Sequence, residues 1–326
     1  MTSDRIFTRL LRWRPVVLAG LALTLAMAAQ AGTATMKAAA GRAIATNDAS
    51  RIVSIGGAVT EILYALGMDK SVVGIDTTSL YPPRAAAEKP SIGYMRQLSA
   101  EGVLGLRPSL ILTVEGAGPK ETMAVLEAAR IPLVVVPDSF SSEGIIERIR
   151  VIAHTTGAIE RSQCIIEQVR ADLTALGKFE SGIDKPKRVL FVLSFVNGRA
   201  MASGNKTAAD GIIRLAGGVN AITEYEGYKP ITDEAVIAAK PDVVLTMERG
   251  GPGTVTADAV FAHPAFAATP AAANRAFVSM EGLYLLGFGP RSARAARDLA
   301  VSLYPNLKSE ILPSEREAAG ANPCRE

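Results

Sequence analysis

The sequence contains an internal repeat. At two positions of the repeat, one copy has a side chain able to bind a ligand where the other copy has a glycine. At a constant offset of 133 residues, Tyr94 aligns with Gly227 and Arg249 aligns with Gly116. A deprotonated phenol is a ligand for hard metal cations, and a guanidinium offers a bidentate fork to a carboxylate. A ligand without two-fold symmetry would require such differences between the copies. Drift in surface loops would also produce them, so the repeat alone leaves both interpretations open.

The repeat predicts the local structure. Residues 98–119 align with residues 231–252, and eight of the 22 aligned positions are identical. In each copy a helix N-cap, Ser99 or Thr232, precedes a short helix that a basic residue and a proline end. The apolar run that follows is typical of a strand buried on both faces, and a helix leading into such a strand is half of a parallel α/β unit. Strands are predicted at 110–114 and 243–247.

Similar elements surround both copies, which predicts two lobes. Further strands are expected at 51–55, 71–75 and 188–193, and helices at 60–66 and 207–215. Between the halves, apolar residues recur at helical spacing and predict one long amphipathic helix. The predicted domains are an N-terminal lobe at 51–156, a linker helix at 157–181 and a C-terminal lobe at 186–312.

The predicted fold class is therefore α/β, with two similar Rossmann-like lobes joined by one long linker helix and a ligand cleft between the lobes. Open α/β sheets bind ligands beyond the carboxyl ends of their strands. The loops after Val114 and Met247 are expected to form the cleft walls. A single stiff helix allows little hinge motion, so we expect a nearly rigid cleft.

Residues 1–31 have the form of a secretory signal peptide. Four arginines precede an uncharged run from Val16 to Ala29, and small residues follow at a cleavage position. The run is short and rich in small residues for a membrane-spanning helix. We predict cleavage and a periplasmic protein. Removing four Arg and one Asp lowers the net charge from +3 to about 0.

Composition argues against several classes of protein. A near-neutral charge without a basic stripe gives no support for nucleic acid as a partner. Two isolated histidines, His154 and His263, and two cysteines cannot build the usual metal sites. No Walker sequence, dinucleotide fingerprint or nucleophile elbow occurs, so an α/β enzyme is only a distant alternative.

The cysteines allow two interpretations. A disulfide between Cys164 and Cys324 is compatible with an oxidising compartment. However, Cys164 lies in a helical pattern and Cys324 is close to the end of the chain. We expect a free buried thiol at Cys164 and an unordered C-terminal tail.

Several short motifs together carry a family resemblance. They are Arg-Ile-Val-Ser-Ile-Gly-Gly at 51–57 with Thr-Glu-Ile at 60–62, Gly-Tyr-Met-Arg-Gln-Leu at 93–98, Ser-Ala-Glu at 99–101, Thr-Ala-Ala-Asp at 207–210 and Gly-Phe-Gly-Pro-Arg at 287–291. Over residues 51–304 the chain resembles the periplasmic haem-binding proteins of bacterial haem ABC importers. Their general pattern is shared with cobalamin- and siderophore-binding relatives, and the segment at 93–98 is the haem-specific part.

The resemblance implies roles for individual residues. Tyr94 would be the axial ligand of the haem iron, with Arg96 supporting it. Fe(III) favours phenolate oxygen, tyrosine is a known haem ligand, and a nearby guanidinium favours the charged phenol. Arg249 would bind a haem propionate, and Tyr228 is a weaker candidate for contact with the ring or a propionate. Arg291 is left open between a cleft residue and a surface helix start.

The chain departs from some relatives because neither His154 nor His263 is placed as a second iron ligand. His154 lies in an apolar helical stretch and His263 precedes a proline. We therefore expect a five-coordinate ferric haem with a single tyrosine ligand. Haem (Fe(III) protoporphyrin IX) is the expected cargo and no catalytic cofactor is expected.

Glu101 and Glu234 are partners in the repeat, each two residues after its N-cap. An acid in a first helical turn is stabilised by the helix dipole, which explains them without any further role. The resemblance implies instead that they dock against the permease dimer of an ABC importer. A monomeric haem-binding protein of an importer is the predicted function, and the same fold carrying a corrinoid or a ferric siderophore is the alternative.

Overall fold

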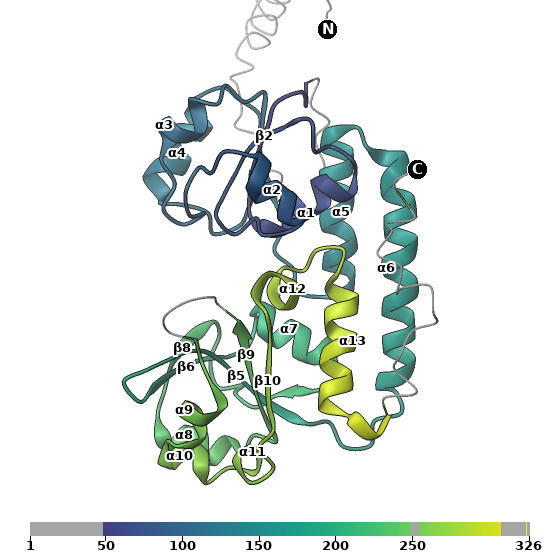
Figure 1. The fold of residues 1–326 in the computed structure, drawn as a ribbon. Coiled ribbons are helices and arrows are strands. Elements are labelled where there is room, and N and C mark those ends of the chain that lie inside the picture. The colour runs from purple at the N-terminus through teal and green to yellow at the C-terminus, as the bar shows by residue number, and fades with distance from the viewer. Residues whose placement is uncertain (1–47, 249–253, 308–323, 325–326) are drawn as a thin grey trace, which may run out of the picture. The chain divides into compact units, whose positions relative to one another are not determined.

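The first half of the chain folds around a four-stranded parallel sheet (Figure 1). The computed structural model describes residues 48–248, 254–307 and 324. The strands lie in the order β2-β1-β3-β4 and every pair is parallel. Their bounds are β1 Ile52–Ile55, β2 Val72–Ile75, β3 Leu110–Val114 and β4 Leu133–Val136.

Both faces of this sheet are buried, which explains the continuous apolar runs in its strands. In β1, Ile52 belongs to one apolar cluster, whereas Val53 and Ile55 belong to another. Successive side chains of a strand point to opposite faces, so apolar layers cover the sheet on both sides. The helices of this lobe are α1 Gly57–Ala65, α2 Pro83–Glu88, α3 Ala100–Leu104, α4 Lys120–Ala128 and α5 Ser142–Thr156.

The second half contains a six-stranded mixed sheet in the order β10-β9-β5-β6-β8, with β7 paired to β5. The bounds are β5 Arg188–Val196, β6 Arg199–Ser203, β7 Val219–Asn220, β8 Tyr228–Ile231, β9 Val243–Glu248 and β10 Phe277–Glu281. β5 pairs in parallel with β7 and β9, and β9 with β10. β6 and β8 add antiparallel pairs that the sequence analysis did not predict. Asn197 and Gly198, both with positive φ (51° and 74°), form the two-residue turn between β5 and β6.

Short helices complete the second lobe. They are α7 Ala208–Leu215, α8 Asp233–Ala239, α9 Ala257–Phe261, α10 Pro264–Ala267, α11 Pro270–Ala273, α12 Gly282–Leu286 and α13 Ser292–Leu303, followed by the 3₁₀ turn Pro305–Leu307. A separate apolar cluster lies under β5, β6 and β9 and is formed within this lobe alone.

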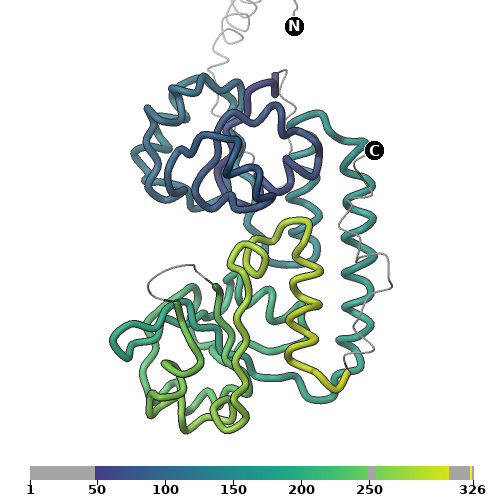
Figure 2. The backbone as a smooth tube through the Cα atoms, viewed as in Figure 1, coloured from purple at the N-terminus to yellow at the C-terminus, as the bar shows by residue number. Residues whose placement is uncertain are grey.

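One helix of 22 residues, α6 Ile159–Glu180, connects the lobes, and Figure 2 shows the chain leaving α5 for α6 and entering the second sheet at β5. Its buried apolar face packs against α5 and α13. The fold class is thus confirmed, whereas the domain boundaries stay predictions. Within the described part of the chain, no helix is both long and apolar enough to span a bilayer.

The repeat has the predicted form in both lobes. Ser99 accepts a hydrogen bond from the Gly102 N–H, and Thr232 accepts one from the Ala235 N–H. β3 has the predicted bounds, and β9 extends one residue beyond them. The basic residue after each short helix adopts a left-handed conformation, with φ of 49° at Arg107 and 44° at Lys240. Each copy therefore reverses the chain in the same way before its buried strand.

The expectation of a free Cys164 is wrong. Cys164 in α6 forms a disulfide with Cys324, with the two Cα atoms 5.6 Å apart. Cys324 is also buried, so this one residue is fixed to the linker helix, and the rest of the C-terminal tail lies outside the described residues. Position in the sequence could not reveal the bond, because 160 residues separate the two cysteines and only the fold brings them together.

Replacing both cysteines with serine is expected to lower the free energy of unfolding by about 2–4 kcal/mol, because the crosslink restricts the unfolded chain. Urea unfolding of the wild type and of the Cys164→Ser, Cys324→Ser variant measures the difference. Adding reductant should destabilise the wild type and leave the variant unchanged. Equal stability of the two proteins under oxidising conditions would contradict the assignment.

Candidate ligand-binding site

Tyr94 lies in a loop that backbone hydrogen bonds fix at the carboxyl end of the first sheet. The Thr77 N–H, just beyond β2, donates to the Gly93 carbonyl at 2.9 Å. The Gln97 N–H donates to the Tyr94 carbonyl at 2.7 Å and closes a turn around the tyrosine. Gly93 has a φ of 92°, which a residue with a Cβ rarely adopts. The Tyr94 side chain itself is 41% exposed.

The same loop is joined to the segment that follows β3. The Gly118 N–H donates to the Met95 carbonyl, and the Leu98 N–H donates to the Gly118 carbonyl, both at 2.9 Å. Loops after β2 and β3 thus form one connected surface at the carboxyl edge, as parallel strands require. Tyr94 is an exposed side chain on a fixed backbone.

The positive charge of Arg96 favours the ionised form of Tyr228, a residue of the other lobe. Burial raises the pKa of Tyr228, the positive charge of Arg96 lowers it, and the carboxylate of Asp138 raises it. Burial raises the pKa of Asp138, and the positive charges of Arg148 and, less strongly, Arg96 oppose that shift. Among the described residues no hydrogen bond joins Arg96 to Tyr94. The structure therefore relates Arg96 to Asp138 and Tyr228, two residues whose connection the sequence analysis missed.

Tyr228 begins β8 beside the start of α7. Its ring packs edge-to-face on Phe191 with centroids 6.1 Å apart, and in the sheet it pairs with Ser203. The Ala209 N–H and the Thr207 hydroxyl both lower the pKa of Tyr228, opposing the burial that raises it. Its phenol oxygen thus faces the first turn of α7.

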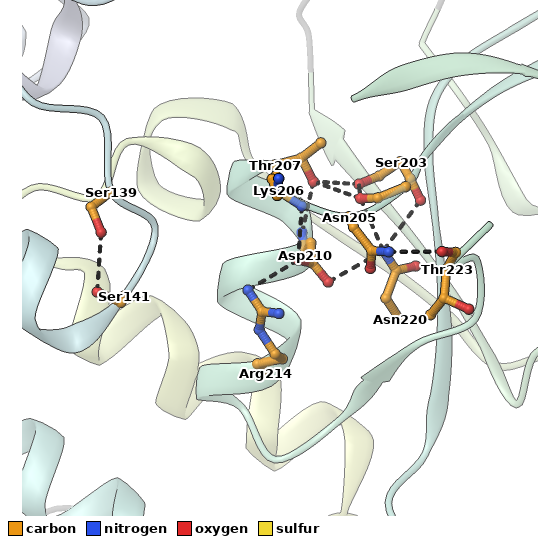
Figure 3. A network of polar contacts seen from close by, with 11 residues as sticks. Ser139, Ser141, Ser203, Asn205, Lys206, Thr207, Asp210, Arg214, Asn220 and Thr223 are labelled. Carbon is orange, nitrogen blue, oxygen red and sulfur yellow. Dashed lines mark hydrogen bonds and ion pairs between the residues drawn. The ribbon is translucent and has the colours of Figure 1, made fainter. Parts of the chain in front are cut away.

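A buried polar network holds this helix start in place (Figure 3). Thr207 caps α7 by accepting from the Asp210 N–H at 3.0 Å, and its hydroxyl is hydrogen-bonded to that of Ser203. Asn220 donates to the Asp210 carboxylate at 3.4 Å, and Arg214 forms an ion pair with the same carboxylate at 3.0 Å. The sequence signal was present in Thr207-Ala-Ala-Asp, a Ser/Thr-x-x-Asp/Glu spacing typical of a helix start; the Asp210 carboxylate accepts from the Lys206 N–H.

Glu101 and Glu234 occupy equivalent exposed positions in the first turns of α3 and α8. Each of these helices leads into a parallel strand of its own sheet, so it starts near the carboxyl edge. Hydrogen bonds to its own N–H and to the Thr232 hydroxyl lower the pKa of Glu234. Both carboxylates thus lie on the edges that carry the candidate binding loops.

The remaining candidates have different outcomes. Arg249 lies outside the described residues. Arg291 is the N-cap residue of α13, is partly exposed and forms an ion pair with the buried Glu61 at 3.0 Å. His263 packs edge-to-face on Phe195 and Phe266 in the second lobe. Within residues 48–248, 254–307 and 324, no group of three or more His, Cys, Asp or Glu side chains could hold a metal ion.

Comparison with known proteins places the chain in a known family. The model of the periplasmic binding protein family matches residues 52–282, so the chain belongs to this family. Its members and relatives are substrate-binding transport proteins, and the chain is accordingly a binding protein and not an enzyme.

Individual relatives have more specific names. The chain is 38% identical to the periplasmic haem-binding protein RhuT of Roseiflexus sp. RS-1, solved in its apo form, with a TM-score of 0.73, covering 81% of this chain and 99% of that one. It is 26% identical to the uncharacterised ABC transporter substrate-binding lipoprotein YvrC of Bacillus subtilis strain 168 over 80% of this chain and 82% of that protein. It is also 26% identical to the vitamin B12-binding protein of Yersinia pestis strain Pestoides F, over 60% of this chain and 69% of that protein.

RhuT is named a periplasmic protein and YvrC an ABC transporter substrate-binding lipoprotein, which supports a periplasmic location. The predicted signal peptide lies outside the described residues, so its cleavage stays a prediction.

Burial raises the pKa of Tyr228 above its ordinary value of 10.0. Replacing Tyr228 with phenylalanine is therefore expected to remove one tyrosine that ionises at a higher pH than a free tyrosine. Above that value the unfolded chain loses this proton first, so the stabilisation present at neutral pH is lost as pH rises. Tyrosinate absorbance and unfolding midpoints, followed with pH in both proteins, measure the effect. A difference between the two absorbance curves that titrates at the ordinary pKa of 10.0 would refute the assigned burial.

Proposed function

We propose that the protein captures ferric haem in the periplasm and delivers it to an ABC importer. The observation that carries the proposal is Tyr94: an exposed phenol on a backbone fixed at the carboxyl edge of a parallel sheet. A side chain that binds the haem iron must be accessible to the incoming haem, and its backbone must be held in a fixed position. The similarity to a solved haem-binding protein over nearly its whole length supports the choice of haem.

Tyr94 would bind the iron as a phenolate. Deprotonation of a phenol is unfavourable at neutral pH, since its reference pKa is about 10. Iron(III) replaces the proton, and positive charge nearby stabilises the anion. Arg96 is exposed on the same loop and supplies such a charge. Because no hydrogen bond from Arg96 constrains Tyr94 in this structure, its influence is proposed to be electrostatic.

Tyr228 would act differently from Tyr94. Burial raises the pKa of Tyr228, so it remains a neutral phenol at physiological pH. A neutral phenol is a hydrogen-bond donor and a flat apolar surface, and both properties suit contact with the macrocycle or a propionate. Arg249 is proposed to bind a propionate, a role that rests on the repeat and on the family resemblance.

Replacing Tyr94 with phenylalanine is expected to abolish the high-spin charge-transfer band of tyrosinate-bound hemin and to weaken hemin binding at least about tenfold. The ring is kept, so the loop should fold unchanged while the oxygen ligand is lost. Titration with hemin followed at the Soret band measures both effects. Tyr225→Phe is the matched control, because the Tyr225 hydroxyl donates to the Ala202 carbonyl within the second lobe. An unchanged spectrum in Tyr94→Phe would overturn the iron ligand.

A corrinoid is the second candidate cargo, favoured by the similarity to a vitamin B12-binding protein. The same titration distinguishes the two ligands. Cyanocobalamin should leave the protein unaffected if haem is the cargo, whereas tight binding of cyanocobalamin and none of hemin would favour the alternative.

Delivery requires contact with a membrane partner, and we propose that Glu101 and Glu234 provide it. Their equivalent places in the two lobes suit a permease dimer with two-fold symmetry and basic residues on its surface. The protein is proposed to reach the permease as a monomer, with one carboxylate presented by each lobe.

Replacing both Glu101 and Glu234 with lysine is expected to abolish haem uptake while hemin affinity stays unchanged, because both side chains are exposed outside the iron ligand loop. Uptake by reconstituted importer and hemin titration give the two measurements. Glu121→Lys is the matched control, since Glu121 is an exposed acid in the first turn of α4. Normal uptake by the double variant, or loss of hemin binding, would overturn the docking role.

A further inference from the structure

Five residues of the second lobe, Gly287–Arg291, are held by groups from the first lobe. The segment joins α12 to α13 and matches the motif Gly-Phe-Gly-Pro-Arg singled out in the sequence. Neither ligand binding nor docking uses it. Its contacts differ in kind from an ordinary helix connection, because two arginines, one from each lobe, are engaged with the opposite lobe.

Arg291 extends from the second lobe into the first. Its Nε and Nη2 donate to the two carboxylate oxygens of Glu61 at 3.1 and 3.0 Å, and its backbone N–H donates to the same carboxylate at 3.2 Å. The guanidinium carbon lies 3.5 Å from the ring centroid of Tyr81 and 5.1 Å from that of Tyr284. One cation thus bonds a carboxylate and stacks on an aromatic ring of the other lobe.

Arg148 makes the reciprocal connection. It belongs to α5 of the first lobe, is 1% exposed, and donates from Nη1 to the carbonyl oxygens of Gly287 at 2.8 Å and Phe288 at 3.1 Å. From Nη2 it also donates to the Asp138 carboxylate at 2.6 Å. Asp138 follows β4 at the carboxyl edge of the first sheet, so this arginine connects the segment to the edge that carries the Tyr94 loop.

Close packing leaves little room for the segment to move. Phe288 is fully buried, has a φ of 53° and packs edge-to-face on Phe140 of the first lobe, with centroids 5.2 Å apart. A Cβ at Gly289 would come within 3.1 Å of the Glu61 carboxyl carbon, so a glycine there lets the backbone approach the buried acid. Gly289, which has no side chain, thus lies directly beside the buried carboxylate of Glu61.

Burying these charges is unfavourable unless each has its partner. Burial raises the pKa of Glu61, and the hydrogen bonds from Arg291 oppose that shift. Removing one member of a buried pair leaves the other charge without compensation, a larger penalty than at the surface. The lobes are therefore held in the one arrangement that satisfies both arginines.

We propose that Gly287–Arg291 is an inter-lobe clamp that sets the separation between the lobe carrying Tyr94 and the lobe carrying Tyr228. Glu61, Arg148 and Arg291 are its positioning residues. The consequence for haem retention rests on the proposed function, whereas the effect on lobe separation does not. The clamp adds a polar constraint to the stiffness of α6.

Spin labels on Glu127→Cys in α4 and Ala238→Cys in α8 test the clamp by reporting the inter-lobe distance in the full chain, since both positions are exposed. Glu61→Gln and Arg291→Gln should each broaden the distance distribution, and the double variant should broaden it no further, because both remove one interaction. Tyr81→Leu, at a 39% exposed position, tests the stacking contact without changing a buried charge. Arg84→Gln is the matched control: Arg84 pairs with Asp69 at 3.1 Å and stacks on Tyr64, all within one lobe.

Hemin retention supplies the second measurement. Dissociation to excess apomyoglobin should be about tenfold faster in the Glu61, Arg291 and Tyr81 variants, with the tyrosinate band unchanged because Tyr94 is intact. Distances that stay narrow in all three variants, or that broaden equally in Arg84→Gln, would overturn the clamp. If no protein binds hemin yet the distances respond as expected, the clamp stands and the haem proposal fails.

Discussion

Parallel strand pairing is the constraint on which the candidate site depends. In the first lobe every strand pair is parallel, so the segments after β1, β2, β3 and β4 all begin at one edge. The loop of Tyr94 is hydrogen-bonded to the segments after β2 and β3, and Asp138 follows β4. Residues far apart in sequence are thereby collected on one surface, where an exposed phenol can be held without being buried.

The second constraint is that a buried charge needs hydrogen-bond partners from the protein in place of water. Arg148 is enclosed between the lobes, and its five donors meet carbonyl oxygens and one carboxylate. Such groups are stable in the interior only when fully hydrogen-bonded. Because these acceptors come from both lobes, Arg148 is fully hydrogen-bonded only when the two lobes are placed as they are in this structure. The apolar cluster that includes residues of α1, α5, α6, α7 and α13 acts in the same direction.

Much of the fold followed from local signals. The repeat predicted β3, β9 and the two N-caps, because apolar runs and capping residues report backbone conformation within a few neighbours. The antiparallel strands β6 and β8 were missed although Asn197-Gly198 is a hairpin signal. The disulfide was missed for a different reason: no local pattern encodes that Cys324 lies beside Cys164.

The sequence by itself determined the class of fold and the equivalence of the two lobes, since these depend on local pattern and on an internal repeat, whereas the roles of Tyr94, Glu101 and Glu234 are implied by a family resemblance. Tertiary structure alone decided that Arg291 pairs with Glu61 and that Arg148 bridges the lobes. Electrostatic and hydrogen-bonding partners are set by distance in space, and the separation of Glu61 from Arg291 by 230 residues leaves no trace in local sequence.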